Sequence, residues 1–198
     1  MIKKILHKIL NIPIVFELQQ KYCNDYSTVR NEFSDILNKE KLKIIDIGCS
    51  TGQCSSQIIN MKKHSYVGID IDPLYIKLAK KRKQGGRFAE MDARNLKFKS
   101  NSFDLAMFIG VLHHMDDDLI SQCLREIKRV LKKNGKIIIA EPVYTKENWL
   151  STFLLNLDRG KHIRTRENYE KLFKPFKLRR KGFFIFSNHR FCSFVFNK

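Results

Sequence analysis

The stretch KIIDIGCSTGQ (residues 43–53) begins as an apolar run and then breaks into small residues around an acid and two glycines. The apolar part predicts a buried strand, and Gln53 to Met61 predict a helix. Glycines in the turn between them, Gly48 to Gly52, let backbone N–H groups approach a ligand at the positive end of a helix. The stretch therefore predicts either a ligand-binding turn or a turn that merely ends a strand.

Three more apolar runs, 65–70, 103–110 and 136–141, are rich in Ile, Val and Phe. Segments of helical period lie between several of these runs. One of them starts after the acids 116–118, which favour a helix N-terminus, and we expect it to stop at Gly135. Continuous apolar strands that alternate with helices indicate an α/β fold, in which helices cover both faces of a parallel sheet.

The length of 198 residues is that of one domain with a full hydrophobic core. Within it we expect N-terminal helices over 1–38 and a core over 39–141. An insertion that lies over the substrate is expected at 142–175, and a C-terminal β-hairpin at 176–198.

Composition restricts the class of protein. No apolar run approaches the roughly 20 residues that span a bilayer. Five scattered cysteines, none spaced C-x-x-C, predict reduced thiols in the cytoplasm and argue against a disulfide framework and a zinc site. The net charge of +18 indicates anionic partners, or it reflects a lysine-rich surface that is simply solvated.

Asp70 ends the second predicted strand roughly 20 residues after the turn, where a carboxylate can accept hydrogen bonds from both ribose hydroxyls. The turn is not G-x-G-x-x-G, and Asp46 ahead of it would repel a pyrophosphate. An acid beside the turn instead suits a ligand that carries an ammonium or sulfonium group. These residues together predict a nucleoside with a cationic substituent.

Four segments resemble class I S-adenosylmethionine-dependent methyltransferases of the methyltransferase-11 type, in a subgroup of uncharacterised bacterial proteins. They read DIGCSTG (46–52), VGIDIDPLYIKLAK (67–80), AEMDARNLKFKSNSFDLAMFIGVLHHMDD (89–117) and LKKNGKIIIAEP (131–142). The resemblance implies a Rossmann-like, seven-stranded, mostly parallel sheet in the order 3-2-1-4-5-7-6, with strand 7 antiparallel and helices on both faces. It also implies S-adenosylmethionine as cofactor, lying across the carboxyl ends of strands 1, 2 and 4.

The family pattern assigns roles to single positions. The turn would frame the methionine part of the cofactor, with Ser50 in place of the family's middle glycine. Asp70 would hold the ribose, Ile71 would pack on the adenine, and Asp92 would meet the adenine edge. The predicted cofactor contacts are Asp46, Gly48, Cys49, Ser50, Gly52, Asp70, Ile71, Asp92, Ala93 and Gly110.

His113 and His114 follow the fourth strand, where the methyl group should lie. An imidazole titrates near neutrality, so one of the two could act as general base if the acceptor must lose a proton. Alternatively, the pair orients the loop. No third ligand has a spacing that predicts a metal site.

The acceptor side is predicted from residues after the fifth strand. Glu141 and Tyr144 should lie at the active edge of the sheet. The segment 157–173 is rich in arginine, and Arg159 and Arg164 could clamp an anionic acceptor. Arginine also pins loops through the same bidentate geometry, so Arg159 could only fix the insertion to the core.

These features predict a methyltransferase that acts on a small molecule, which could be anionic or linked to a lipid or sugar. An RNA methyltransferase is the alternative suggested by the charge and by the mixed basic and aromatic residues 179–186. A non-enzymatic protein that binds the cofactor and docks through the basic amphipathic segment 1–10, for example on an anionic membrane, is a third hypothesis. The sequence does not indicate an oligomeric state.

Overall fold

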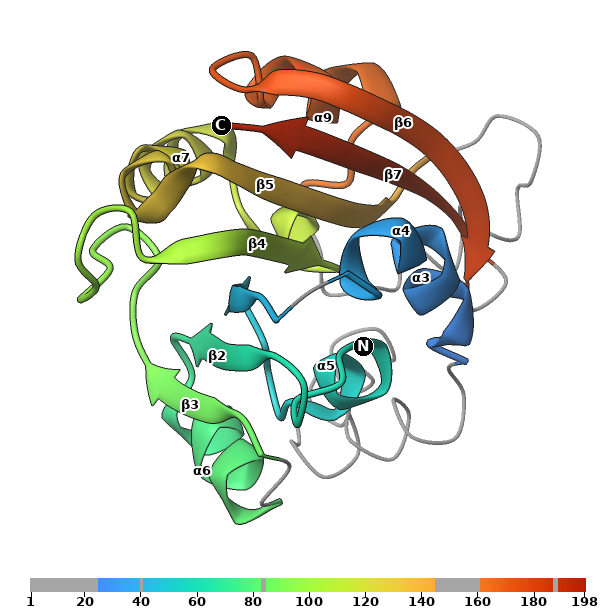
Figure 1. Cartoon of the computed structure of the whole chain (residues 1–198). Helices are drawn as coiled ribbons and strands as arrows, with labels where there is room; N and C mark the ends of the chain where they lie inside the picture. The colour runs from blue at the N-terminus through green and yellow to red at the C-terminus, as the bar shows by residue number, and fades with distance from the viewer. Residues whose placement is uncertain (1–24, 40, 83–84, 145–160, 187–188) are drawn as a thin grey trace, which may run out of the picture.

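The computed structural model describes residues 25–39, 41–82, 85–144, 161–186 and 189–198. In this part of the chain seven strands form one sheet in the order β3-β2-β1-β4-β5-β7-β6 (Figure 1). The strands are β1 (Lys43–Ile47), β2 (Ser65–Asp70), β3 (Arg87–Glu90), β4 (Phe103–Ile109), β5 (Leu131–Pro142), β6 (Lys177–Phe186) and β7 (His189–Asn197). Strand β7 runs antiparallel to β5 and β6, and the other pairs are parallel. The predicted sheet order and the antiparallel seventh strand are confirmed.

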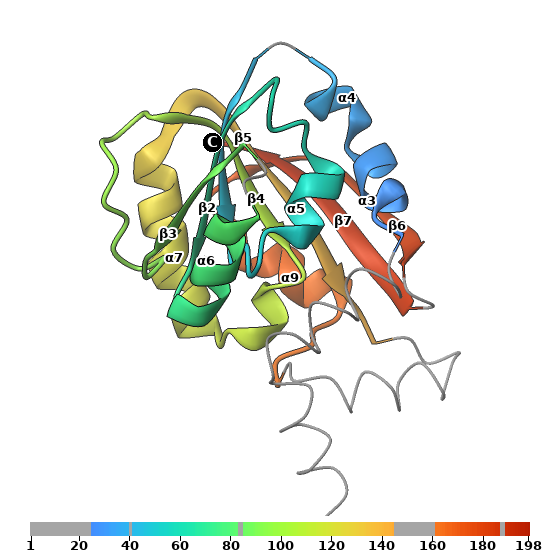
Figure 2. The same cartoon turned by 90° about the horizontal axis from the view of Figure 1, so that it is seen from below.

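Helices cover both faces of this sheet, as Figure 2 shows. One core joins the sheet to α7 and α9, and the other joins it to α3, α4, α5 and α6. Their bounds are α3 (Ser27–Glu32), α4 (Ser34–Leu37), α5 (Gln53–Ile58), α6 (Pro73–Lys81), η1 (Leu112–His114), α7 (Asp117–Val130) and α9 (Arg166–Leu172). None of these described helices is long and apolar enough to cross a membrane.

Strand alternation explains the two cores. In β4, Leu105 and Met107 belong to the core with α3 to α6, whereas Ala106 and Phe108 belong to the core with α7 and α9. Successive side chains of a strand point to opposite faces, so a run that is apolar at every position is buried on both sides. The parallel pairing of β1 to β5 places the carboxyl ends of these strands along one edge of the sheet.

Local capping signals set the starts of α6 and α7. Asp72 accepts hydrogen bonds from the N–H groups of Leu74 and Tyr75 at the start of α6, and Asp116 accepts from Leu119 N–H (2.8 Å) at the start of α7. The predicted stop of α7 at Gly135 is wrong. The helix ends at Val130 because Leu131 pairs with Phe103 and begins β5.

The hairpin predicted at the C-terminus is confirmed as β6 and β7. Helix α9 lies within the segment predicted as an insertion, yet its Tyr169 and the following Phe173 are completely buried in the core with α7. Residues 145–160 of that predicted insertion, and the amphipathic segment 1–10, lie outside the described residues.

Candidate active site

The glycine turn lies at the carboxyl end of β1, against the end of β2. The N–H groups of Gly48 and Cys49 both donate to the carbonyl oxygen of Ile69, at 2.9 and 3.0 Å. Gly48 has φ +71°, and a Cβ at this position would overlap Cγ2 of Val111, which follows β4. Glycine is therefore required at residue 48 for both conformational and steric reasons.

Ser50 occupies the middle of this turn with φ +50°, and Gly52 follows with φ +72°. The left-handed conformation costs a residue with a Cβ about 1 kcal/mol or more. The position thus has the backbone conformation that the family's glycine provides, and serine adopts it at a cost.

Asp70 connects the end of β2 to the turn. Its Oδ2 accepts from Ser50 N–H at 2.9 Å and its Oδ1 accepts from Asp72 N–H at 3.0 Å. Burial raises the pKa of Asp70 above its usual value. A carboxylate has about four acceptor positions, so two protein donors leave capacity for ribose hydroxyls. The neighbouring Ile71 is 68% exposed, at the position predicted to pack on adenine.

Asp46 lies beneath the turn. Its carboxylate is 3% exposed and accepts hydrogen bonds from the hydroxyls of Ser55 and Tyr66. The direct ligand contact predicted for Asp46 is therefore wrong in this structure, because protein donors enclose the carboxylate. Burial raises the pKa of Asp46 to about 6.

Cys49 also points inward. Its side chain is buried, and a Cβ on Gly68 of β2 would lie 2.7 Å from the Cys49 sulfur. Burial raises the pKa of its thiol. Because the side chain is turned into the protein, only the backbone of Cys49 is placed to line a ligand.

Asp92 and Ala93 begin the loop after β3, next to Asp70, whose carbonyl accepts from Met91 N–H at 2.9 Å. Arg94 forms a bidentate ion pair with Asp92, with a shortest N–O distance of 2.6 Å. This pairing lowers the pKa of Asp92. Sequence reasoning missed Arg94, although an arginine two residues after a predicted ligand-binding acid is a readable signal.

Glu141, at the end of β5, is completely buried. Its Oε1 accepts from Val111 N–H and Leu112 N–H, both at 2.8 Å, and its Oε2 accepts from His113 N–H at 3.3 Å. The predicted contact between Glu141 and the acceptor is therefore wrong. The carboxylate instead fixes the loop that follows β4.

Glu141 Oε2 also lies 2.7 Å from Nδ1 of His113. We assign the Nδ1 proton to this bond, which leaves Nε2 as the acceptor in the neutral ring. The His113 ring is 4.1 Å from the ring of the exposed His114, measured between centroids. A Cβ built on Gly110 would have His113 Cε1 as its neighbour, at 4.0 Å. The Cε1–Nε2 edge of His113 therefore faces the carboxyl end of β4.

Arg164 has no N–H group left to bind the methyl acceptor. Its five N–H groups make five hydrogen bonds, to Asp117 twice and to the carbonyls of Leu112, Met115 and His162. The clamp predicted for Arg164 is therefore wrong, and the residue pins its segment to η1 and α7. Its side chain is 9% exposed.

The remaining predicted positions give less information. Tyr144, just after β5, is 42% exposed. Arg159 lies outside the described residues. Within the described part of the chain, no group of three or more His, Cys, Asp or Glu side chains is arranged to hold a metal ion.

Comparison with known proteins agrees with this geometry. The family model described as "Methyltransferase domain" matches residues 45–139. The demethylmenaquinone methyltransferase of Thermotoga maritima is 32% identical over 108 residues, 54% of this chain and 46% of the relative. The phthiotriol/phenolphthiotriol dimycocerosates methyltransferase of Mycobacterium leprae is 32% identical over 108 residues, 53% and 39% of the two chains. The chain thus matches less than half the length of these two relatives.

Among solved structures, a SAM-dependent methyltransferase from Methanosarcina mazei superposes with a TM-score of 0.69 at 20% identity, covering 84% of this chain and 96% of that one. Sheet order, glycine turn and acid after β2 define the Rossmann-like class I methyltransferase fold. Residues 45–139 of the chain match a methyltransferase domain, and the sheet that contains them has the fold of the class I S-adenosylmethionine-dependent methyltransferases. S-adenosylmethionine is the cofactor that such a domain implies.

The residues present fit this cofactor. The hydroxyls of Ser50 and Thr51 are buried at the turn and have no hydrogen-bond partner among the residues that the structure describes. Buried polar groups are normally paired, so two such hydroxyls in one turn indicate a ligand. Asp70 adjoins them with acceptor capacity to spare, and Gly110 at the end of β4 leaves its own Cβ position open.

The buried acid beneath the turn predicts an unusual pH dependence of stability. An acid with a higher pKa in the folded state holds its proton more tightly there, so its contribution to stability is lost as the pH rises between about 4 and 6. For Asp46 this amounts to roughly 3 kcal/mol. Asp46→Asn keeps an acceptor for Ser55 and Tyr66 but does not titrate.

We therefore expect the free energy of urea unfolding of Asp46→Asn, relative to wild type, to rise by roughly 3 kcal/mol between about pH 4 and pH 7. Subtracting the wild-type curve removes the titration of all other groups. A difference that does not change with pH would contradict the assignment.

Proposed function

We propose that this protein transfers the methyl group of S-adenosylmethionine to a small molecule, and that His113 takes the proton which the acceptor loses. The observation that carries the proposal is the 2.7 Å bond between His113 Nδ1 and a fully buried carboxylate, at the same edge of the sheet as the glycine turn. The cofactor, when bound, supplies an activated methyl group on a sulfonium.

In this proposal the chain binds the cofactor mainly through backbone groups and through two acids. The backbone of the turn, Gly48 to Gly52, and the backbone of Gly110 surround the methionine part. Asp70 accepts from the ribose hydroxyls, and Ile71 covers the adenine. Asp92 and the backbone of Ala93 meet the adenine edge. Each of these groups lies at the carboxyl ends of β1 to β4, which supports one shared site.

His113 and Glu141 have separate tasks. Nε2 of His113 takes the proton that the methyl acceptor loses, and the Glu141 carboxylate stabilises the imidazolium that results. Three backbone N–H groups hold Glu141 in place, so the ring orientation is fixed before any ligand binds. His114, exposed beside His113, would contact the acceptor from the other side. A base is useful only for a nucleophile that carries a proton, such as a hydroxyl group.

Three observations support a small, weakly charged acceptor. The two relatives above are named as methyltransferases of demethylmenaquinone and of phthiotriol/phenolphthiotriol dimycocerosates. Arg164 cannot serve as an anion clamp, because all its donors are used within the protein. The exposed Tyr144 offers an apolar ring with a polar tip at this edge.

The class of acceptor can be tested without knowing the molecule. Wild-type protein and Asp70→Asn, which should not hold the ribose, are incubated with methyl-labelled S-adenosylmethionine and a cell extract. The extract is then separated into lipid and small-molecule, protein, and RNA fractions. We expect label in the lipid and small-molecule fraction with wild type and at least about tenfold less with Asp70→Asn. Label that depends on Asp70 but enters RNA or protein would contradict the proposed acceptor class.

The role of His113 has a readout that does not need the acceptor. Glu141→Gln removes the negative charge while keeping the shape of the side chain. The His113 pKa, followed by the NMR shift of the Cε1 proton, should fall, because the carboxylate favours the imidazolium.

The pKa of the exposed His114 provides the internal control and should move less. An unchanged His113 pKa in a folded Glu141→Gln variant would remove the basis for Glu141 as a positioning residue.

A further inference from the structure

The edge of the sheet opposite the glycine turn differs strongly from the active edge in charge. We call it the amino edge, because β1, β4, β5 and β6 begin there and β7 ends there. Its segments are 41–43, 101–104, 131–136, 177–178 and 196–198. Together these segments contain seven lysines and one acid, Asp104. The lysines are Lys41, Lys43, Lys132, Lys133, Lys136, Lys177 and Lys198.

Strand pairing brings these segments together. Lys43 N–H donates to Asp104 Oδ2 at 2.8 Å, and Lys132 Nζ donates to Oδ1 at 2.6 Å, so the acid is already paired. Asn197 of β7 lies between Lys136 of β5 and Lys177 of β6 in the register of the sheet.

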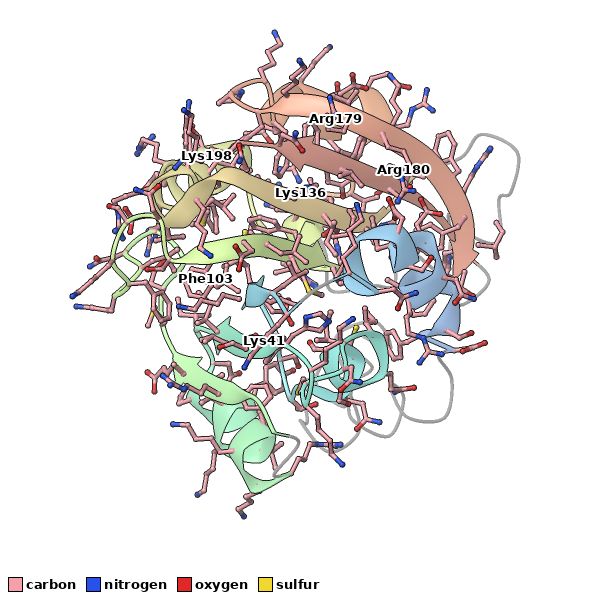
Figure 3. The ribbon with its side chains drawn as sticks, in the orientation of Figure 1. Lys41, Phe103, Lys136, Arg179, Arg180 and Lys198 are labelled. Carbon is pink, nitrogen blue, oxygen red and sulfur yellow. The ribbon has the colours of Figure 1, made fainter. Side chains whose placement is uncertain are left out.

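Lys198 lies at the same edge and contacts the start of β5. Lys198 N–H donates to Gly135 O at 3.0 Å, and its Nζ donates to Leu131 O at 2.6 Å. Lys41, Lys136 and Lys198 are labelled in Figure 3, where this edge can be followed across the sheet.

The lysines of the amino edge form a row across five neighbouring strands, and the length of this row matches a short segment of a linear polyanion. Five neighbouring strands at about 4.8 Å spacing give a row of roughly 19 Å. One strand of a duplex carries a phosphate about every 3.4 Å along the axis, so the row spans about five phosphates. Lys41, Lys43, Lys133 and Lys177 are exposed, and long flexible lysines can adjust to such a spacing.

The exposed apolar side chains lie elsewhere. In the described residues the large exposed hydrophobics are Ile71, Leu74, Tyr144, Phe183 and Ile185, and none belongs to the amino edge. Amphipathic membrane anchors insert apolar groups between lipids, and single-stranded nucleic acid is bound by aromatic stacking. The amino edge offers neither in its described part, which leaves contacts to a phosphate backbone.

We propose that the amino edge binds the phosphate backbone of a double-stranded nucleic acid, independently of base sequence. The surface lies at the end of the sheet away from the glycine turn, so the proposal holds whatever the methyl acceptor is. Contacts of this kind position a protein without reading sequence.

Two variants with the same change in net charge test the proposed binding of a duplex. Lys41→Glu/Lys133→Glu/Lys177→Glu reverses three exposed lysines of the amino edge. Lys77→Glu/Lys80→Glu/Lys81→Glu makes the same change in net charge on the exposed side of α6. Binding to a fluorescein-labelled duplex of about 20 base pairs is followed by anisotropy between about 50 and 200 mM salt. Thermal unfolding confirms that both variants are folded.

We expect the amino-edge variant to lose about tenfold or more in affinity at low salt, and the slope of log K against log salt to become shallower by about 2.7. The α6 variant should lose much less. Equal losses in both variants would show that only net charge matters, and no binding by wild type would also overturn the proposal. Wild type that binds vesicles containing phosphatidylserine but does not bind the duplex would also overturn the proposal.

Discussion

The site depends first on a steric constraint at the turn between β1 and α5. Gly48 is in the left-handed region and lies against Val111, so no side chain fits at this position. The same turn is anchored from below, because two of its N–H groups share the carbonyl of Ile69. The ends of β1, β2 and β4 are thereby fixed relative to one another. A loose turn would separate the acid after β2 from the loop after β4, and with it the ribose contact from the proposed base.

The second requirement is that buried charges find complete sets of partners. An ionised group that is removed from water is costly unless hydrogen bonds replace its hydration. Glu141 meets this condition with three backbone N–H groups and an imidazole, and Arg164 meets it with five hydrogen bonds to four acceptor atoms. Both residues therefore act on the loop after β4 rather than on a ligand. These hydrogen bonds hold the loop after β4 in place, which is favourable for orienting a nucleophile beside it.

Much of the fold can be predicted from the sequence, because strands buried on both faces and capped helices leave local signals. The glycine turn, Asp70 and the position of His113 at the active edge follow from such signals and from the family pattern. The direction in which a side chain points does not follow from such signals. Whether Glu141 points to the acceptor or inward is decided by the β4–β5 register, in which Gly110 N–H donates to Ala140 O. Arg164 finds Asp117 through a contact 47 residues away in the chain, which no local pattern indicates. The stop expected at Gly135 failed for the same reason, since strand pairing at Leu131 outweighs a local helix signal.

The central claim is that the left-handed turn at residues 48–52 cradles the cofactor, and calorimetric titration of S-adenosylmethionine tests it most directly. Wild type should bind, and Gly48→Ala, which is forced against Val111 and strained by about 1–2 kcal/mol, should bind at least about tenfold more weakly while remaining folded. Equal affinity of the two proteins, or no binding by wild type, would contradict the account.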